Sequence, residues 1–335
     1  MKNILVVNRL GIGDTVLTTS LAQAIKQHLP NARVGFVVAP KSVDLLKNHP
    51  YIDDVFSYQR NTKDDIIKKI KKSEYTDAII VDERLTSSLL AWRAGCKLRN
   101  IGRVISVFGH HWLKPKRVQS DSATQRFAQY VQYIFSSYKY QYLAPVIGGV
   151  TNQENNKIND WIHQINNTVS KRILIIPRGV AENKNWPSEY FGVVNQYLNS
   201  KSIIPIYTGA KQDIEYIDAI KGEKINIAGR FNLRELAVLA KQMDACITVC
   251  TGPMHIVATT GIPMIALYGP TDPAYWAPLH ATIVKADHAP CQLCRGTHCS
   301  YKIKYDCMQQ LTPDRVIKSI DSLLNLNTEI EEKHE

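Results

Sequence analysis

The sequence lacks any long apolar run. Nowhere in its 335 residues does an apolar stretch approach the ~18 consecutive residues that a membrane-spanning helix needs. The first residues, MKNILVVNR, also lack the basic segment, the long apolar segment and the cleavage site of a secretory signal. We therefore expect a cytoplasmic protein.

Nucleic-acid-binding modules are also missing from the sequence. There is no zinc-finger spacing of Cys and His, and no glycine- and aromatic-rich RNA-binding signature. The formal charge is nonetheless +11 and the pI about 9.2, which suits an anionic partner. We expect that partner to be a nucleotide phosphate, an acidic glycolipid or an anionic membrane face, and not a nucleic acid.

Seven cysteines are present, and in a reducing cytoplasm they are expected as thiols or metal ligands. Four of them follow the spacing C-x₂-C-x₄-C-x₇-C: Cys291, Cys294, Cys299 and Cys307. Four thiolates this close together could form a tetrahedral structural metal site. The alternative is a set of thiols packed under the last helix.

Short β-branched runs alternate with helix-like stretches along the whole chain. In the first half, NILVV precedes a helical pattern over 16–28, and in the second half RILIIP begins a similar alternation. This order is typical of doubly wound parallel sheets in an α/β protein. The polar, Asn-rich stretch 148–170, in which we expect a helix around Asn156–Ile165, interrupts the alternation. We therefore predict domains over 1–150 and 171–311, a linker over 151–170 and a C-terminal helix over 312–330, with ligands at the carboxyl ends of the strands.

The loop NRLGIGDT follows the first predicted strand. Gly11 and Gly13 fit the first two positions of a dinucleotide-binding G-x-G-x-x-G loop, but the third position is Val16. A branched residue there would prevent close packing of the helix on the strand, which argues against a nicotinamide or flavin site. Asp14 could cap the helix, carry a catalytic carboxylate, or do both.

The loop PRGVAENKNWPSEYF, over residues 177–191, follows the first strand of the second half. Its cations Arg178 and Lys184 could meet a diphosphate with the help of amides at a helix start, or they could be solvated surface charges. Trp186 followed by Pro187 indicates a buried anchor for this loop.

The loop TGPMH follows the strand CITVC directly. Thr251 adds a hydroxyl, and Gly252 and Pro253 begin a helix whose first amides form a site for an anion. His255 lies in the first turn, where we interpret it as a phosphate or sugar ligand rather than a base.

Several blocks together resemble glycosyltransferase family 9, the ADP-heptose:lipopolysaccharide heptosyltransferases. The resemblance covers most of residues 1–320, and it is carried by NRLGIGDTVLTTSLAQAIKQHLPNARVGFVV, KNWP, IAGRFNLRELAVLAKQMDACITV and TGPMHIVATTGIPMIALYGPTDPAYWAP. It implies the GT-B fold, in which two Rossmann-like domains face a central cleft, with the acceptor on the N-terminal side and the nucleotide sugar on the C-terminal side. The resemblance also implies inversion at the anomeric carbon and no cofactor or metal required for catalysis.

Site residues can be carried over from the family by position. Asp14 matches the general base, which takes a proton from the acceptor hydroxyl, and Lys184 matches a lysine that binds the diphosphate. Asp213, or Glu215 beside it, stands where the family places a ribose ligand. The donor-binding turn comprises Thr251, Gly252, Pro253, Met254 and His255. Some relatives bind iron, so the cysteine cluster is a candidate for structural Zn or Fe.

One position departs from the family pattern. The residue before TGPMH is usually an aspartate that contacts the donor sugar, but here it is Cys250. A thiol cannot accept two strong hydrogen bonds as a carboxylate can. Either another group binds the sugar, or the donor is not the usual heptose.

The stretch FGHHWLKPKR, over residues 108–117, is rich in histidine and cations within the acceptor-side half. We predict acceptor contacts from His110, Lys114 and Lys116, together with Gly13 of the first loop, and peripheral contact with the inner face of the membrane. An ordinary solvated loop is the alternative.

The predicted activity is inverting transfer of a heptose, or a similar sugar, from an ADP-sugar donor to a lipopolysaccharide core or related acidic glycan. The nearest alternative is a transferase of the same fold with another nucleotide sugar or a protein acceptor. Another is a non-catalytic protein that binds sugar nucleotides or glycolipids.

Overall fold

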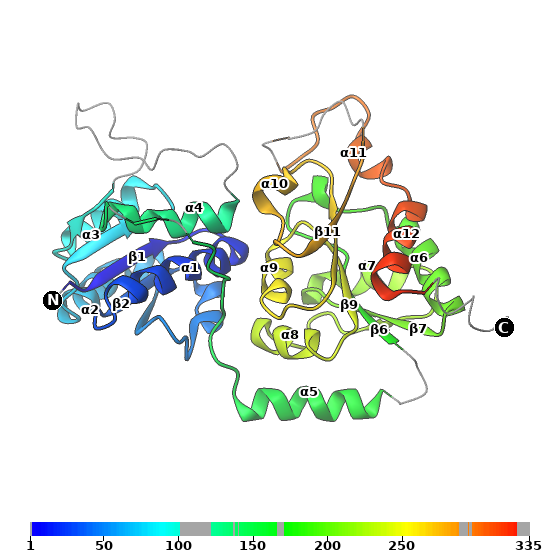
Figure 1. Ribbon diagram of the computed structural model, residues 1–335, viewed down its shortest axis with the longest axis horizontal. Helices are drawn as coiled ribbons and strands as arrows, with labels where there is room; N and C mark the ends of the chain where they lie inside the picture. The colour runs from blue at the N-terminus through cyan, green and yellow to red at the C-terminus, as the bar shows by residue number, and fades with distance from the viewer. Residues whose placement is uncertain are drawn as a thin grey trace. The chain divides into compact units, whose positions relative to one another are not determined.

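The computed structural model describes residues 2–100, 122–136, 138–139, 141–165, 171–287, 294 and 297–326. The chain divides into two compact units, residues 1–149 and 150–335. Each unit is built on one parallel sheet with helices around it (Figure 1).

The first unit has five strands in the order β3-β2-β1-β4-β5. These strands are β1 (Ile4–Asn8), β2 (Val34–Val38), β3 (Asp54–Ser57), β4 (Asp77–Ile80) and β5 (Lys97–Leu98). The helices are α1 (Ile12–His28), α2 (Lys63–Lys72), α3 (Leu85–Arg93) and α4 (Ala123–Gln129). Strand β1 is buried along its whole length because it lies in the middle of the sheet, and its Leu5 and Val7 share a core with α2 and α3.

The second unit has six strands in the order β11-β10-β9-β6-β7-β8. These strands are β6 (Lys171–Ile176), β7 (Ile203–Tyr207), β8 (Ile225–Asn226), β9 (Ala245–Val249), β10 (Met264–Tyr268) and β11 (Ala281–Lys285). Its helices are α5 (Asn152–Gln164), α6 (Ser188–Ser200), α7 (Ile214–Ala219), α8 (Leu233–Ala240), α9 (Gly252–Ala258), α10 (Pro273–Trp276), α11 (Asp306–Gln309) and α12 (Pro313–Leu324).

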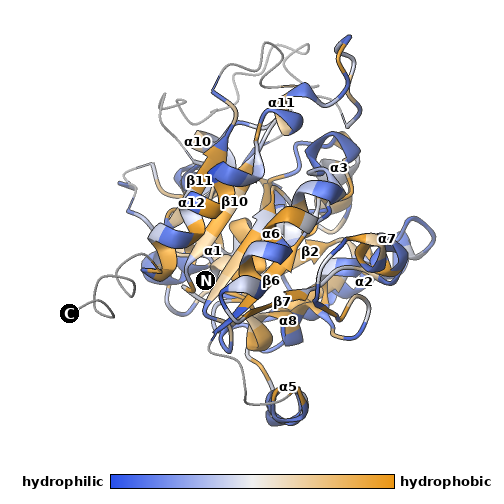
Figure 2. Cartoon of the chain, turned by 90° about the vertical axis from the view of Figure 1, so that its right-hand side faces the viewer, coloured by the Kyte–Doolittle hydropathy of each residue, from blue (hydrophilic) through white to orange (hydrophobic). Residues whose placement is uncertain are grey.

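Apolar strands with helices on both faces form the core of the second unit. Strands β6 and β10 are mostly hydrophobic in Figure 2, whereas α6 carries both hydrophilic and hydrophobic residues. One buried cluster joins this sheet to α6 and α12, and another joins it to α5, α8 and α9. This is the arrangement that near-continuous apolar strands require, because both faces of the sheet are covered.

The segment predicted as a linker contains a packed helix. Helix α5 begins at a capping box in which Thr151 and Glu154 hold each other's backbone amides. Its Ile158 and Trp161 are buried against the second unit, and Lys157 forms an ion pair of 2.8 Å with Glu235. Helix α5 therefore packs on the second unit through these two residues.

Among the described residues, no helix combines the length and the apolar character needed to span a membrane.

Candidate active site

Asp14 lies in the first turn of α1, at its third residue. Gly11 is the N-cap, so the helix begins before Asp14 and four residues earlier than the apolar pattern predicts. The prediction of Asp14 as the N-cap residue is therefore wrong in position. Its carboxylate still stabilises the helix start, because Oδ2 accepts a hydrogen bond of 3.2 Å from the Gly11 amide. Gly13 is buried in the same turn.

The side chain of Asn8, the last residue of β1, fixes the path of this loop. Its Nδ2 donates to Thr18 Oγ1 at 2.7 Å and to the Asp14 carbonyl at 3.2 Å. Its Oδ1 accepts from the Leu10 amide at 3.1 Å. Because these three bonds join the end of the strand to the first turns of α1, they hold the backbone around Asp14 in one conformation.

A buried ion pair between Arg9 and Asp82 also anchors this loop, and it was not predicted from the sequence. The Arg9 Nε atom lies 3.1 Å from Asp82 Oδ2, and these side chains are 6% and 0% exposed. Ser87 donates to the same oxygen at 2.7 Å, and the Arg9 guanidinium stacks 4.3 Å from the centre of the Tyr58 ring. The signal was present in the sequence, since Arg9 and Asp82 both follow strands, and β1 and β4 pair side by side.

In the second unit, three loops meet at the carboxyl edge of the sheet. Strands β6, β7 and β9 are neighbours, so the residues that follow them lie close together. Gly179 shows how close: a Cβ atom there would lie 3.1 Å from the Thr251 hydroxyl. A Cβ atom at this distance would be tighter than an ordinary contact, so the glycine lets the loop after β6 pass close to the loop after β9.

Lys184 is brought to the start of α9 by a well-anchored loop. Trp186 is buried as predicted, and its Nε1 donates to the Leu311 carbonyl at 2.8 Å. Asn185 accepts from the Gly179 amide at 2.9 Å. With the loop held in this way, Lys184 Nζ lies 4.0 Å from Cys250 Sγ.

His255 is buried in the first turn of α9. Burial lowers the pKa of its imidazole to about 4, and the nearby Lys184 charge lowers it further in the same direction. The ring is therefore neutral near pH 7, as a hydrogen-bonding ligand should be.

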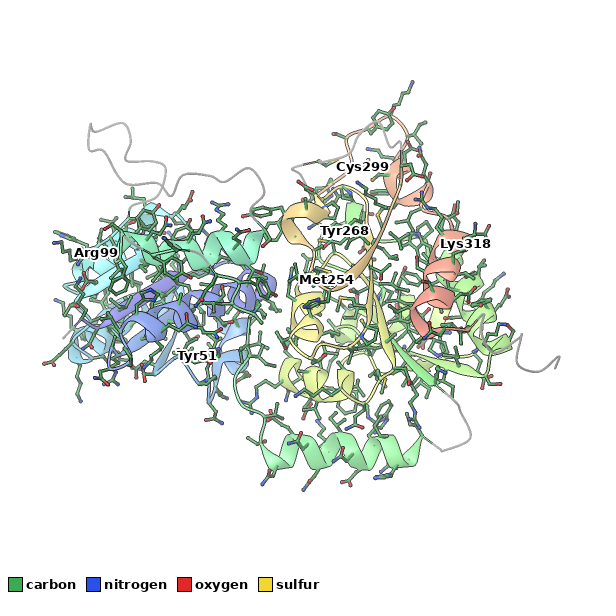
Figure 3. All side chains as sticks on the ribbon, viewed as in Figure 1. Tyr51, Arg99, Met254, Tyr268, Cys299 and Lys318 are labelled. Carbon is green, nitrogen blue, oxygen red and sulfur yellow. The ribbon has the colours of Figure 1, made fainter. Side chains whose placement is uncertain are left out.

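The remaining residues of the turn divide by exposure. Thr251, Gly252 and Pro253 are half-buried, so a ligand can reach them. Met254 is fully buried, and its sulfur accepts a hydrogen bond of 3.7 Å from the Tyr268 hydroxyl (Figure 3). The Met254 side chain therefore packs in the core of the second unit.

Arg178 and Asp213, which the sequence analysis treats as separate donor ligands, contact each other. Arg178 Nη1 lies 3.5 Å from Asp213 Oδ1, and the guanidinium stacks 4.7 Å from the centre of the Tyr216 ring. The other Asp213 oxygen accepts from the Ala210 amide at 2.9 Å. Asp213 and Tyr216 together orient Arg178; the role of Tyr216 was not predicted.

Several predicted residues lie outside the described part of the chain. These are His110, Lys114, Lys116 and Cys291. Of the other cysteines in the cluster, Cys299 and Cys307 are buried and Cys294 is half-buried. Within the described ranges there is no group of three or more His, Cys, Asp or Glu side chains that could hold a metal ion. The structure therefore does not support the predicted structural Zn or Fe.

The profile of glycosyltransferase family 9 (heptosyltransferase) matches residues 64–304. The chain belongs to glycosyltransferase family 9. It is therefore a glycosyltransferase, as the resemblance predicted. A relative, the lipopolysaccharide core heptosyltransferase OpsX of Haemophilus influenzae, is 22% identical over 83% of this chain and 82% of its own length.

Solved structures confirm the predicted GT-B fold of two parallel-sheet units. The structure of the Escherichia coli ADP-heptose LPS heptosyltransferase II matches with a TM-score of 0.76 and 20% sequence identity. The match covers 98% of this chain and all of the E. coli chain. The E. coli heptosyltransferase WaaC, solved with ADP-2-deoxy-2-fluoro heptose, matches with a TM-score of 0.66 and 16% identity, covering 96% and 99% of the two chains.

Proposed function

We propose that this chain transfers a heptose from an ADP-heptose donor to a sugar of the lipopolysaccharide core, with inversion at the anomeric carbon. The observation that carries the proposal is the Lys184 ammonium beside the Thr251–His255 turn, at the carboxyl edge of a parallel sheet. A similar H. influenzae protein is a lipopolysaccharide core heptosyltransferase, and a similar E. coli protein binds an ADP-heptose analogue.

In this proposal the second unit binds the donor. The Lys184 ammonium and the Arg178 guanidinium neutralise the diphosphate, and Lys184 stabilises the negative charge that develops on the leaving ADP. This role needs no catalytic metal. The Thr251 hydroxyl, the Gly252 amide and the neutral His255 ring hydrogen-bond phosphate or sugar oxygens. Asp213 orients Arg178.

The first unit then binds the acceptor. The Asp14 carboxylate takes the proton of the acceptor hydroxyl while that oxygen attacks the anomeric carbon. The bond between that carbon and the diphosphate oxygen breaks, and its electron pair stays on ADP. Gly13, and the predicted His110, Lys114 and Lys116, belong to the acceptor side. Because this acceptor is lipid-anchored, the enzyme works in peripheral contact with the cytoplasmic face of the inner membrane.

Cys250 favours a second candidate within the same family. A carboxylate at this position could accept hydrogen bonds from two sugar hydroxyls, but the thiol that lies 4.0 Å from Lys184 cannot. The second candidate is therefore a transferase with another nucleotide sugar, or with a protein acceptor. A protein that binds a sugar nucleotide without turnover is the third.

A donor screen separates these candidates. The purified protein is incubated with a deacylated lipopolysaccharide core and with ADP-heptose, other ADP-sugars or UDP-, GDP- and dTDP-sugars, and both nucleotide release and product mass are measured. The proposal expects ADP release and a heptosylated product only with ADP-heptose. Turnover with a different donor supports the second candidate. Thermal stabilisation by a nucleotide sugar without any product would leave the binding protein and the transferase with a protein acceptor.

A further inference from the structure

Helix α3 of the first unit buries mostly small residues and exposes three of its four large apolar residues. Ser87, Ser88, Leu90 and Ala91 are buried against the unit. Leu85, Leu89 and Trp92 are 40%, 45% and 65% exposed. In an ordinary surface helix most of the large apolar side chains face the core, whereas in α3 only Leu90 does.

The outward residues form one stripe. They stand at positions i, i+4 and i+7, and at 3.6 residues per turn they fall within about 60° of the helix circumference. The other large hydrophobic side chains that are exposed in the described residues come from well-separated elements: Tyr142, Val180, Val193, Ile214, Leu279 and Ile303. Single exposed residues of that kind are normal, whereas a contiguous stripe marks an interaction surface.

The inward face explains why the helix keeps this orientation. Ser87 donates to Asp82, the carboxylate that holds Arg9 under the Asp14 loop. Rotating α3 to bury the stripe would break this bond and leave a buried carboxylate without it. The stripe therefore stays on the surface.

Cations flank the stripe along the chain. Arg84 directly precedes Leu85, Arg93 directly follows Trp92 and Lys97 comes four residues later, whereas Arg99 forms an ion pair with Asp77. Arg93 stands four residues after Leu89, on the flank of the stripe, and its side chain is 47% exposed even with Asp64 at 3.4 Å. An apolar stripe with cations at its side is complementary to a surface whose outer layer is anionic and whose interior is apolar.

We propose that the Leu85–Leu89–Trp92 stripe of α3 docks onto an anionic phospholipid bilayer. The exposed parts of three side chains are far less than the ~800 Å² per partner of a stable dimer. They suit shallow insertion at the level of the lipid headgroups, where Trp is favoured and Arg can extend its guanidinium to phosphates. The inference deepens the proposed function, because it rests on that function for the lipid-anchored acceptor that brings the enzyme to a membrane.

Vesicle flotation of the full-length protein tests this. The vesicles contain phosphatidylcholine alone or phosphatidylcholine with phosphatidylglycerol. The stripe variant is Leu85→Gln/Leu89→Gln/Trp92→Gln, and Trp92→Gln alone is the milder variant should the triple variant fail to fold. The matched control, Val193→Gln/Leu279→Gln, removes exposed apolar side chains from the second unit. We expect about tenfold loss of binding to the anionic vesicles for the triple variant, a smaller loss for Trp92→Gln, and none for the control.

Three results would overturn the docking proposal. The wild-type protein could fail to bind anionic vesicles, or the stripe and control variants could lose vesicle binding equally. The third result is a wild-type protein that is dimeric while the stripe variant is monomeric. Turnover with ADP-heptose and a deacylated acceptor should be unchanged in the stripe variant. The flotation assay contains neither donor nor acceptor, so its result does not depend on whether the protein transfers a heptose. The docking proposal and the proposed function can therefore fail separately.

Discussion

One cation at the carboxyl edge of each sheet, Arg9 in the first unit and Lys184 in the second, has contrasting surroundings. In the first unit the Arg9 guanidinium is buried against Asp82, so its charge is neutralised inside the protein. In the second unit the neighbour of the Lys184 ammonium is the Cys250 thiol, and within the described ranges no carboxylate forms an ion pair with it. A buried pair fixes the shape of a loop, whereas a cation without a carboxylate is ready for an anionic ligand. We therefore interpret the first edge as a rigid frame for Asp14 and, in line with the proposed function, the second as a receptor for a diphosphate.

Removing the base from the frame should have the largest effect. Asp14→Asn keeps an oxygen that can accept from the Gly11 amide but can no longer take a proton. We expect kcat to fall by ~10²–10⁴-fold while ADP affinity, measured by calorimetry, stays nearly constant. A variant with normal turnover would remove Asp14 from the mechanism. Normal turnover in Asp14→Asn but not in Asp14→Ala would indicate that only the helix start matters.

Removing the cation from the receptor should have the next largest effect. Lys184→Ala removes the charge that faces the leaving diphosphate, and we expect kcat to fall by ~10²–10³-fold with weaker ADP binding. Lys184→Arg, which keeps the charge, should recover part of both. If ADP affinity and turnover survive in Lys184→Ala, the receptor interpretation of the second edge is wrong.

Removing Arg9, the cation at the edge of the first sheet, should lower the free energy of unfolding and leave ADP affinity unchanged. Arg9→Ala leaves Asp82 buried without its ion pair, which should cost about 3 kcal/mol of the free energy of unfolding in urea. The double variant Arg9→Met/Asp82→Leu removes both charges and should recover most of that loss. An Arg9→Ala protein of normal stability but weak ADP binding would reverse the assignment of the two edges.

Acid should weaken both units to a similar degree. Burial lowers the pKa of His49 in the first unit to about 4, although a hydrogen bond with the Val146 carbonyl opposes the shift. It also lowers the pKa of His255 in the second unit to about 4. Because the unfolded chain binds these protons first, each contribution to stability is complete above about pH 6.5 and is lost as the pH falls toward 4.

We expect each histidine to remove about 2 kcal/mol of stability between about pH 7.5 and about pH 5. Urea unfolding at the two pH values measures it. His49→Gln and His255→Gln should each flatten the pH dependence by an equal share. A flattened profile in only one of them would mean that the two units differ in acid lability.

The smallest effect should come from the side chains that orient Arg178. Asp213→Asn loses the ion pair but keeps an oxygen for the Ala210 amide. Because the pair is partly exposed, we expect only a few-fold rise in the KM for the donor, with kcat unchanged. Arg178→Gln should raise KM more than Asp213→Asn. An equal fall in kcat for both would show that Arg178 acts in the transition state.

Much of the fold could be predicted from the sequence, because a parallel strand that is buried on both faces is a nearly continuous run of apolar residues. NILVV, RILIIP and ACITV all form central strands, and the loops singled out for chemistry do follow strands. The family assignment and the GT-B fold are confirmed as well. The helix expected around Asn156–Ile165 is present as α5, but it begins four residues earlier, at the capping box of Thr151 and Glu154.

The sequence by itself determined the alternation of elements, the loops that follow the strands, and which of them carry an acid, a lysine or a histidine. Only the tertiary structure decided how those side chains pair: Arg9 with Asp82, Arg178 with Asp213, and Lys184 with Cys250. It also decided that α3 exposes Leu85, Leu89 and Trp92 to solvent while it buries Leu90. The physical reason is that period and propensity act between near neighbours in the chain, whereas charge pairing and burial depend on which strands lie side by side.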